Sequence, residues 1–283
     1  MSTYTTPAAL RTATGAILAV VIAACATAGP ASPATSGPAA SPAITTTPQA
    51  STSEPPASAS PSPLVAASPS ASADPVFDPA AFPDGATVTN PWFPLIPGTT
   101  FTSRGMKDGE AAVDRFTVSD RTKVIAGVTT RIVQDRLTLS GILHERTTDY
   151  YAQDQAGNVW YLGEDTAELD AHGKVLNRDG TWHAGVDGAI PGIYMEAEPV
   201  VGHAYRQEFY PGEAEDHFEV ISLTATVHVP FGDFQNALRT KEWTPLEPDV
   251  LDNKFYARGV GQVREVAVKG ANEVLELVKV EHR

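Results

Sequence analysis

Glutamate and histidine side chains are the groups in this sequence whose types and spacing suggest metal binding. Glu213, Glu215 and His217 alternate along the chain and are followed by Glu219. In a β-strand, residues two apart share one face, so these carboxylates and the imidazole would point the same way. Neighbours on that face lie about 6.6–6.8 Å apart, too far for all four to reach one ion. A solvated polar face explains the pattern more simply, so we expect no metal and no other cofactor.

A second group contains the paired carboxylates Glu196 and Glu198, with His183 and His203 nearby in the sequence. Paired carboxylates and imidazoles are typical of general acid–base chemistry. Nothing in the sequence brings these four side chains together, and Pro199 favours an exposed loop. We therefore predict no catalytic residue.

Known catalytic motifs are absent from the chain. The sequence has no G-x-S-x-G, H-E-x-x-H, P-loop, dinucleotide-binding G-x-G-x-x-G or EF-hand pattern. Cys25 is the single cysteine, so the remainder of the chain has neither a thiol nucleophile nor a disulfide. Stability must come from core packing.

Aromatic residues are concentrated in two neighbouring predicted strands. Successive strand residues point to opposite faces, so adjacent aromatics place bulky rings on both faces. Either both faces are covered, as in a sandwich, or one face lines a cavity. The second alternative predicts a pocket for an apolar ligand, with these candidate residues: Tyr150, Tyr151, Trp160, Tyr161 and Trp182.

The N-terminus has the pattern of a bacterial export signal. Arg11 precedes an apolar run at residues 13–24, which is shorter than the roughly 20 residues of a membrane-spanning helix. The run ends in IAAC at residues 22–25, which resembles the lipobox of bacterial lipoproteins. This resemblance implies that residues 1–24 are removed and that Cys25 carries a lipid anchor, including palmitate-type acyl chains. The alternative is an ordinary secretory signal followed by a chance cysteine.

Residues 25–75 form a predicted linker rich in Pro, Ala, Ser and Thr, with no aromatic residue. Such a segment cannot bury enough apolar surface to offset the entropy of ordering, so we expect it to be disordered. Its composition also resembles an O-glycosylated stalk. The folded domain is predicted over residues 76–283.

The net charge of −14 limits the partners of this domain. An acidic surface is repelled by nucleic-acid phosphates and by anionic lipid headgroups. We therefore expect no nucleic-acid partner, and we expect membrane attachment only through Cys25.

From residue 100 onward the hydrophobic period is two, and short turns interrupt it. Ala126-Gly127 and Ser140-Gly141 predict tight hairpin turns, as does the stretch at 269–272 near the end. We predict one all-β domain, an antiparallel meander of about ten to twelve strands that forms a curved sheet, open barrel or sandwich. The proline-rich aromatic segment 76–97 is predicted to be an irregular arm packed on the core.

Several strings resemble an uncharacterised family of secreted actinobacterial lipoproteins. They cover most of residues 90–263 and are NPWFPLIPG (90–98), YAQD and GNVWY (151–161), PGEAED (211–216), TKEWTPL (240–246) and YA with GVG (256–261). The resemblance implies an extracytoplasmic lipoprotein but gives no activity to transfer. The meander is also loosely similar to the half-barrel lipid carriers of bacterial envelopes, an analogy of fold class alone.

These observations predict a lipid-anchored protein on the extracytoplasmic face of the cell membrane. We expect it to be a non-enzymatic binding or carrier module for an apolar small molecule. The alternative is an exported hydrolase or metal-dependent enzyme that uses Glu and His groups.

Overall fold

The computed structural model describes residues 76–83 and 85–283. The predicted signal peptide, the predicted lipidation site Cys25 and the predicted linker lie outside these residues. Within the described residues, no helix has the length and apolar character that crossing a membrane requires. The elements at the start of the domain are η1 (Pro79–Ala81), β1 (Thr99–Lys107), β2 (Glu110–Ile125), β3 (Val128–Leu139), β4 (Ile142–Gln153), β5 (Val159–Leu169), β6 (Val175–Asn177) and β7 (Trp182–His183).

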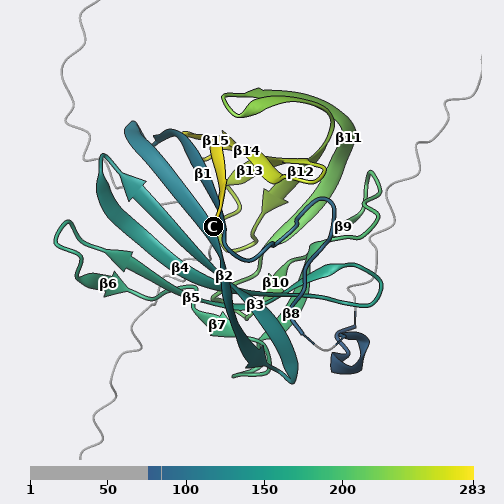
Figure 1. Ribbon diagram of the computed structural model, residues 1–283. Helices are drawn as coiled ribbons and strands as arrows, with labels where there is room; N and C mark the ends of the chain where they lie inside the picture. The colour runs from purple at the N-terminus through teal and green to yellow at the C-terminus, as the bar shows by residue number, and fades with distance from the viewer. Residues whose placement is uncertain (1–75, 84) are drawn as a thin grey trace, which may run out of the picture. The chain divides into compact units, whose positions relative to one another are not determined.

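The remaining strands are β8 (Ile190–Met195), β9 (Ala204–Arg206), β10 (Glu208–Phe209), β11 (His217–Val229), β12 (Gly232–Trp243), β13 (Leu251–Ala257), β14 (Gly261–Lys269) and β15 (Glu273–His282). All described strands join one antiparallel sheet in the order β10-β8-β5-β4-β3-β2-β1-β15-β14-β13-β12-β11-β9, with β6 and β7 paired to β5 (Figure 1). Two meanders, β1–β5 and β11–β15, therefore meet where β15 pairs with β1.

One short segment brings the two ends of this sheet together. Residues 204–206 pair with β11, and residues 208–209 pair with β8. Between them, the amide of Gln207 donates to the carbonyl of Asp216 at 2.7 Å. The sheet is therefore almost closed around an interior, which confirms the predicted all-β, antiparallel and strongly curved architecture.

Local turn chemistry sets the strand boundaries. Ala126-Gly127 and Ser140-Gly141 have positive φ at both positions, 47° and 83° for the first pair and 48° and 87° for the second. This conformation matches the twist of a two-residue hairpin. Both predicted turns are confirmed. The structure has more strands than expected because the turn-rich stretch after β5 contributes several strands of two or three residues.

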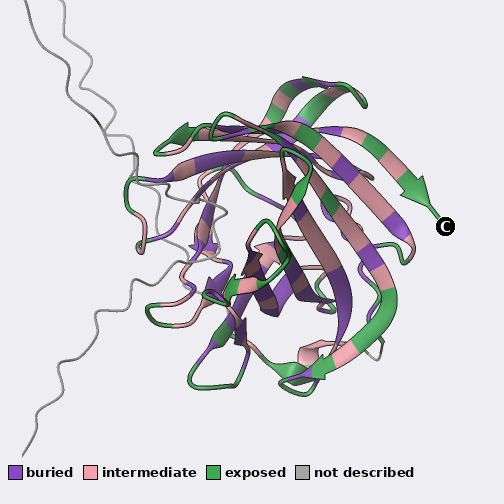
Figure 2. Ribbon diagram, turned by 90° about the vertical axis from the view of Figure 1, so that its left-hand side faces the viewer, coloured by how far each residue is buried: buried purple, intermediate pink, exposed green. Residues whose placement is uncertain are grey.

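The N-terminal arm, residues 76–98, packs into and onto the sheet. Asn90 fixes it: its side-chain amide donates to the carbonyls of Gly157 and Glu196 at 3.0 and 2.9 Å. Phe93 enters the interior, and Leu95 pairs by a β-bridge with Val88. Figure 2 shows the burial that results, with buried stretches along the curved strands and exposed residues at the hairpin tips.

Candidate functional site

The interior of the curved sheet contains a cavity of about 180 Å³. Its lining residues on β1, β2 and β14, such as Ser103, Phe116 and Gln262, are partly exposed. Its lining residues on β5 and β10, such as Tyr161, Glu164 and Glu208, are buried. The cavity thus runs inward from the β1, β2 and β14 side to a closed end at β5 and β10.

Carboxylates dominate the polar part of the lining. Eight of the lining residues are acidic and one is a lysine, Lys254. The acidic residues come from β2, β3, β4, β5, β10, β14 and the segment before β11, and they are Asp114, Asp135, Glu145, Asp149, Glu164, Glu208, Asp216 and Glu265.

Strand alternation places several of these groups on the inner face. On β4, residues Glu145, Thr147, Asp149 and Tyr151 are two positions apart and all line the cavity. A strand whose inner face is exposed to a cavity can retain polar side chains there, whereas a packed core would exclude them.

A bulge at Gly163 changes the alternation on β5. Tyr161 and Glu164 both line the cavity although they are three residues apart, and the β4–β5 register shifts by one residue here. Gly163 has φ of 140°, and a Cβ at this position would lie 2.4 Å from the carbonyl oxygen of Trp182. Glycine therefore permits both the bulge and the close approach of β7.

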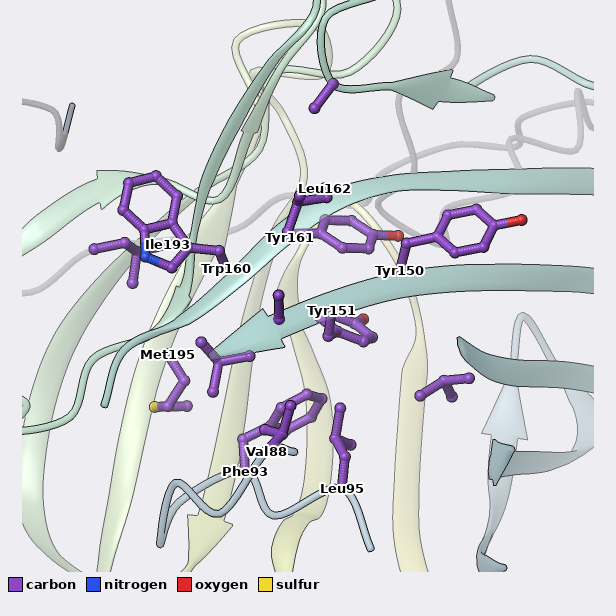
Figure 3. Close-up of a cluster of buried hydrophobic side chains, with 14 of the residues drawn as sticks. Val88, Phe93, Leu95, Tyr150, Tyr151, Trp160, Tyr161, Leu162, Ile193 and Met195 are labelled. Carbon is purple, nitrogen blue, oxygen red and sulfur yellow. The ribbon is translucent and has the colours of Figure 1, made fainter. Parts of the chain in front are cut away.

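Aromatic rings form one wall of the cavity. Tyr151 and Tyr161 stack with centroids 4.9 Å apart, and Tyr194 meets Tyr151 edge-on at 5.0 Å. Phe93 completes this wall, 4.5 Å from Tyr194. Figure 3 shows Tyr151 pointing from β4 toward Phe93 of the arm. The ring faces supply an apolar surface beside the carboxylates.

At the closed end lie Glu164, Glu208 and Asp216, and burial, followed by charges that include those of Glu208 and Asp216, raises the pKa of Glu164. The three residues are 3%, 2% and 8% exposed, and one oxygen of each has no hydrogen-bond partner: Oε1, Oε1 and Oδ1 respectively. The other oxygen of Glu208 accepts a bond from Trp182 Nε1 at 2.6 Å. Burial, followed by the charge of Asp216, raises the pKa of Glu208 well above its usual range. Burial also raises the pKa of Asp216 to about 7.

A second acidic group lies on β2, β3 and β4. Asp114 and Asp135 share a side-chain hydrogen bond, and burial followed by the charge of Asp135 raises the pKa of Asp114. Asp149 accepts a hydrogen bond from the Tyr161 hydroxyl at 2.8 Å. Burial, and next the charge of Asp135, still raises the pKa of Asp149. In both groups, buried carboxylates with too few cations favour the protonated form.

Lys254 is the cavity's own cation. Its ammonium lies 2.8 Å from Glu242 and 3.9 Å from Glu265. Burial would lower the pKa of Lys254, but the charges of these two glutamates raise it above its ordinary value.

The five aromatic residues predicted to line a pocket fall into two sets. Tyr151 and Tyr161 line the cavity, and Trp182 lies directly behind Tyr161 with centroids 5.5 Å apart. Tyr150 and Trp160 do not line it; they belong to the opposite face of the sheet. One face of these two strands therefore lines the cavity, and the other face is covered.

On that opposite face, Tyr150 belongs to a network of polar side chains. Its hydroxyl donates to Asp165 at 2.5 Å, and Lys123 donates to the same hydroxyl at 3.2 Å. His183 lies 3.2 Å from Asp165. Trp160 packs instead against Phe77 of the arm, at 5.6 Å between centroids. These contacts are structural.

The glutamate–histidine patterns do not converge on a site. β11 begins at His217, so Glu213 and Glu215 lie in the preceding turn rather than on a strand face. His217 stacks on Trp243 with centroids 5.5 Å apart. Glu196 does meet His203 at 3.2 Å, but His183 lies elsewhere with Asp165. Among residues 76–83 and 85–283, no group of three or more His, Cys, Asp or Glu side chains is arranged to hold a metal ion.

The cavity carboxylates were missed at the sequence level. The signal that could have found them is the E-x-T-x-D-x-Y alternation at 145–151, where acids share a strand face with an aromatic residue. Such a face can equally be solvated, so the pattern becomes informative only once the sheet is known to close.

Comparisons with known proteins leave the family undetermined. No protein-family model and no curated protein matches the chain. Two solved structures are similar: a candidate exported protein with a YmcC-like fold from Bacteroides fragilis, and a candidate lipoprotein from Parabacteroides distasonis. The first is 14% identical with a TM-score of 0.41, covering 68% of this chain and 100% of that one. The second is 13% identical with a TM-score of 0.35, covering 70% and 100%.

Proposed function

We propose that this protein is a non-enzymatic binding module, anchored by a lipid on Cys25 at the extracytoplasmic face of the cell membrane. Its ligand is a small molecule that occupies the interior cavity. The observation that supports binding most directly is the combination of an aromatic wall with buried carboxylate oxygens that have no partner at the closed end. Ligand sites in proteins typically combine apolar walls with a few directed polar groups.

The cavity limits the size of this ligand. Its volume of about 180 Å³ is that of a site for a small molecule. The apolar part of the ligand lies against Tyr151, Tyr161 and Phe93. The purely apolar ligand expected from the sequence fits the aromatic wall, but it would leave the carboxylates unpaired, so we propose a ligand that also has polar groups.

Binding alone is favoured over hydrolysis by the identity of the lining residues. Among the described residues that line the cavity, none is a histidine or a cysteine. The hydrogen-bonded pair Asp114 and Asp135 is the one feature that supports the hydrolase alternative, because paired carboxylates sharing a proton can act as acid and base. A hydrolytic activity that disappears in Asp114→Asn would favour the enzyme and overturn the binding proposal.

The cavity is tested by filling it. Ser103 lines the partly exposed side of the cavity, so Ser103→Phe should place a ring inside. Protein purified from its own cell envelope is unfolded, and released small molecules are identified by mass spectrometry. A compound should be released by the wild type and lost from Ser103→Phe, while Ser222→Phe, a half-exposed serine of β11 outside the cavity, should retain it. Equal release from all three proteins would refute an interior site.

The anchor is tested separately. Radiolabelled palmitate should label the wild-type chain, and Cys25→Ala should abolish both labelling and firm membrane association. Two acyl chains on one residue give stable attachment, whereas the acidic domain alone has no affinity for anionic headgroups. A Cys25→Ala protein that stays on the membrane would refute this part of the proposal.

A further inference from the structure

The charges that line the cavity are strongly unbalanced. Eight carboxyl groups face it, against the single ammonium of Lys254, which already has two glutamate partners. Buried carboxylates normally pair with cations or donors, because an unpaired charge in a low-dielectric interior is costly. The interior therefore has more acceptor capacity than its own residues satisfy.

This unused capacity is concentrated at the closed end. Glu164 Oε1, Glu208 Oε1 and Asp216 Oδ1 are buried without a hydrogen-bond partner, and their residues line the cavity. Mutual repulsion among Glu164, Glu208 and Asp216 raises the pKa of Glu164 and of Glu208, in addition to the effect of burial. Trp182 donates to Glu208 and Thr244 to Asp216. One buried oxygen of each of the three groups still lacks a donor, which indicates a ligand that brings donors.

Lys254 shows how the same interior holds an ammonium group. Its Nζ sits between Glu242 at 2.8 Å and Glu265 at 3.9 Å. Glu265 also lines the cavity. An alkylammonium between two carboxylates is thus an arrangement that this fold already contains. At the closed end, burial raises the pKa of Asp216 and of Glu208, and the charge of Lys254 lowers the pKa of both, but by less than burial raises it.

An organic cation fits these walls better than a metal ion. In the part of the chain that the structure describes, no three potential ligands have the geometry of a metal site. The faces of Tyr151, Tyr161 and Tyr194 lie next to the carboxylates, and aromatic faces attract ammonium groups and cover methylene chains. A second acidic group, Asp114 with Asp135, lies on β2 and β3 and lines the same cavity.

From these observations we infer that the cavity binds an aliphatic diamine or polyamine, with one ammonium held by Glu164, Glu208 and Asp216 and a second by Asp114 and Asp135. The inference rests on the proposed function and names its ligand class. The methylene segment lies against the aromatic wall. Chain length is limited by the cavity volume of about 180 Å³.

The test is isothermal titration of the dialysed full-length chain at pH 8, where aliphatic amines are charged. Four probes are compared: spermidine, 1,4-diaminobutane, 1-aminobutane and the uncharged 1,4-butanediol. The diamine and spermidine should bind at least about tenfold more tightly than the monoamine, because each ammonium has its own acidic group. The diol should give no measurable binding. Diol affinity equal to that of the diamine would overturn the inference.

Matched variants locate the binding. Glu164→Gln and Glu208→Gln keep the side-chain shape and remove the charge, so each should weaken spermidine binding by about tenfold or more. Glu219→Gln, whose carboxylate pairs with Lys241 away from the cavity, should leave the affinity unchanged. If either cavity variant fails to fold by circular dichroism, Asp216→Asn replaces it. Equal weakening in Glu219→Gln would assign binding to the acidic surface and overturn the inference.

Two outcomes separate this inference from the proposed function. If spermidine does not bind but a different compound is released by the wild type and lost from Ser103→Phe, the amine inference fails and the binding module stands. If spermidine binds equally to the wild type and Ser103→Phe, the interior site itself is wrong and both fail. Tight binding of Mg²⁺ alone, abolished by Glu208→Gln, would replace the amine with a metal.

Discussion

The strongest test of the acidic interior is to neutralise Glu145. This residue lines the cavity from β4, and burial, followed by the charge of Asp135, raises its pKa from 4.5 to about 7. The ammonium of Lys107 and the hydroxyl of Thr147 oppose that rise. Glu145→Gln removes the charge but retains an oxygen that can accept from the Thr147 hydroxyl, which lies 3.3 Å from Glu145 Oε1.

The magnitude follows from linkage between protonation and folding. Because the folded protein holds this proton more tightly than the unfolded chain, the stabilising contribution of the group is fully present below its unfolded pKa. That contribution is lost progressively as pH rises from about 4.5 to about 7, and it is constant above. Each pKa unit corresponds to about 1.4 kcal/mol, so ionising Glu145 costs the fold about 3 kcal/mol at pH 8.

Glu145→Gln should therefore unfold at higher urea than the wild type at pH 8, with a gain of up to about 3 kcal/mol in the free energy of unfolding. The gain should shrink toward zero between pH 7 and pH 4.5. Urea unfolding followed by circular dichroism at pH 5, 6, 7 and 8 measures it. Glu198→Gln, at an exposed site, should shift stability by less than about 0.5 kcal/mol at every pH.

Two results would refute this reasoning. One is a Glu145→Gln gain that is the same at pH 5 and pH 8, because the effect would then not come from ionisation. The other is a variant less stable than the wild type at pH 8, because the negative charge would then contribute favourably to the fold.

Two further substitutions test how the cavity is built. Gly163→Ala should lower the free energy of unfolding by at least about 2 kcal/mol, because φ is 140° and the new Cβ would lie 2.4 Å from the Trp182 carbonyl oxygen. Gly173→Ala, at a position with φ of 79° and open space, is the control and should lower it by only about 1 kcal/mol. Equal losses of stability in thermal denaturation would disprove the close approach of β7 to Gly163. Trp182→Phe should lower the free energy of unfolding by about 1–3 kcal/mol, because it removes the indole N–H that donates to Glu208. Trp243→Phe is the control, because the Trp243 ring stacks on the half-exposed His217. In urea unfolding, this variant should lose less stability than Trp182→Phe.

Local chemistry made the strands and turns predictable. The two predicted turns, Ala126-Gly127 and Ser140-Gly141, have positive φ at both positions, and the segment between them is β3. The arm at 76–97 was expected to be irregular because of its prolines, and its described residues contain no strand and only the short η1. The Glu213 and Glu215 positions were assigned to a strand face, but a turn begins at Pro211-Gly212 and β11 starts only at His217.

The site itself was only partly predictable. Tyr151 and Tyr161 were predicted to line a pocket because adjacent aromatic residues on a strand place rings on both faces of the sheet. Strand alternation alone does not show which of the two faces is internal. Tyr150 and Trp160 have the same residue types and lie on the opposite face. The bulge at Gly163, which turns Glu164 inward, depends on the approach of β7 nineteen to twenty residues later in the chain.

The sequence by itself determined the all-β class, the hairpins and the predicted lipid attachment at Cys25, because each depends on residues close together in the chain. Tertiary structure alone decided that the sheet closes through residues 204–209 and that acids from distant strands face one cavity. A carboxylate on a strand face is exposed to solvent or buried, depending on whether another segment of the chain covers that face. Whether a side chain is covered depends on contacts between segments that are distant in the chain, so a local sequence pattern cannot predict it.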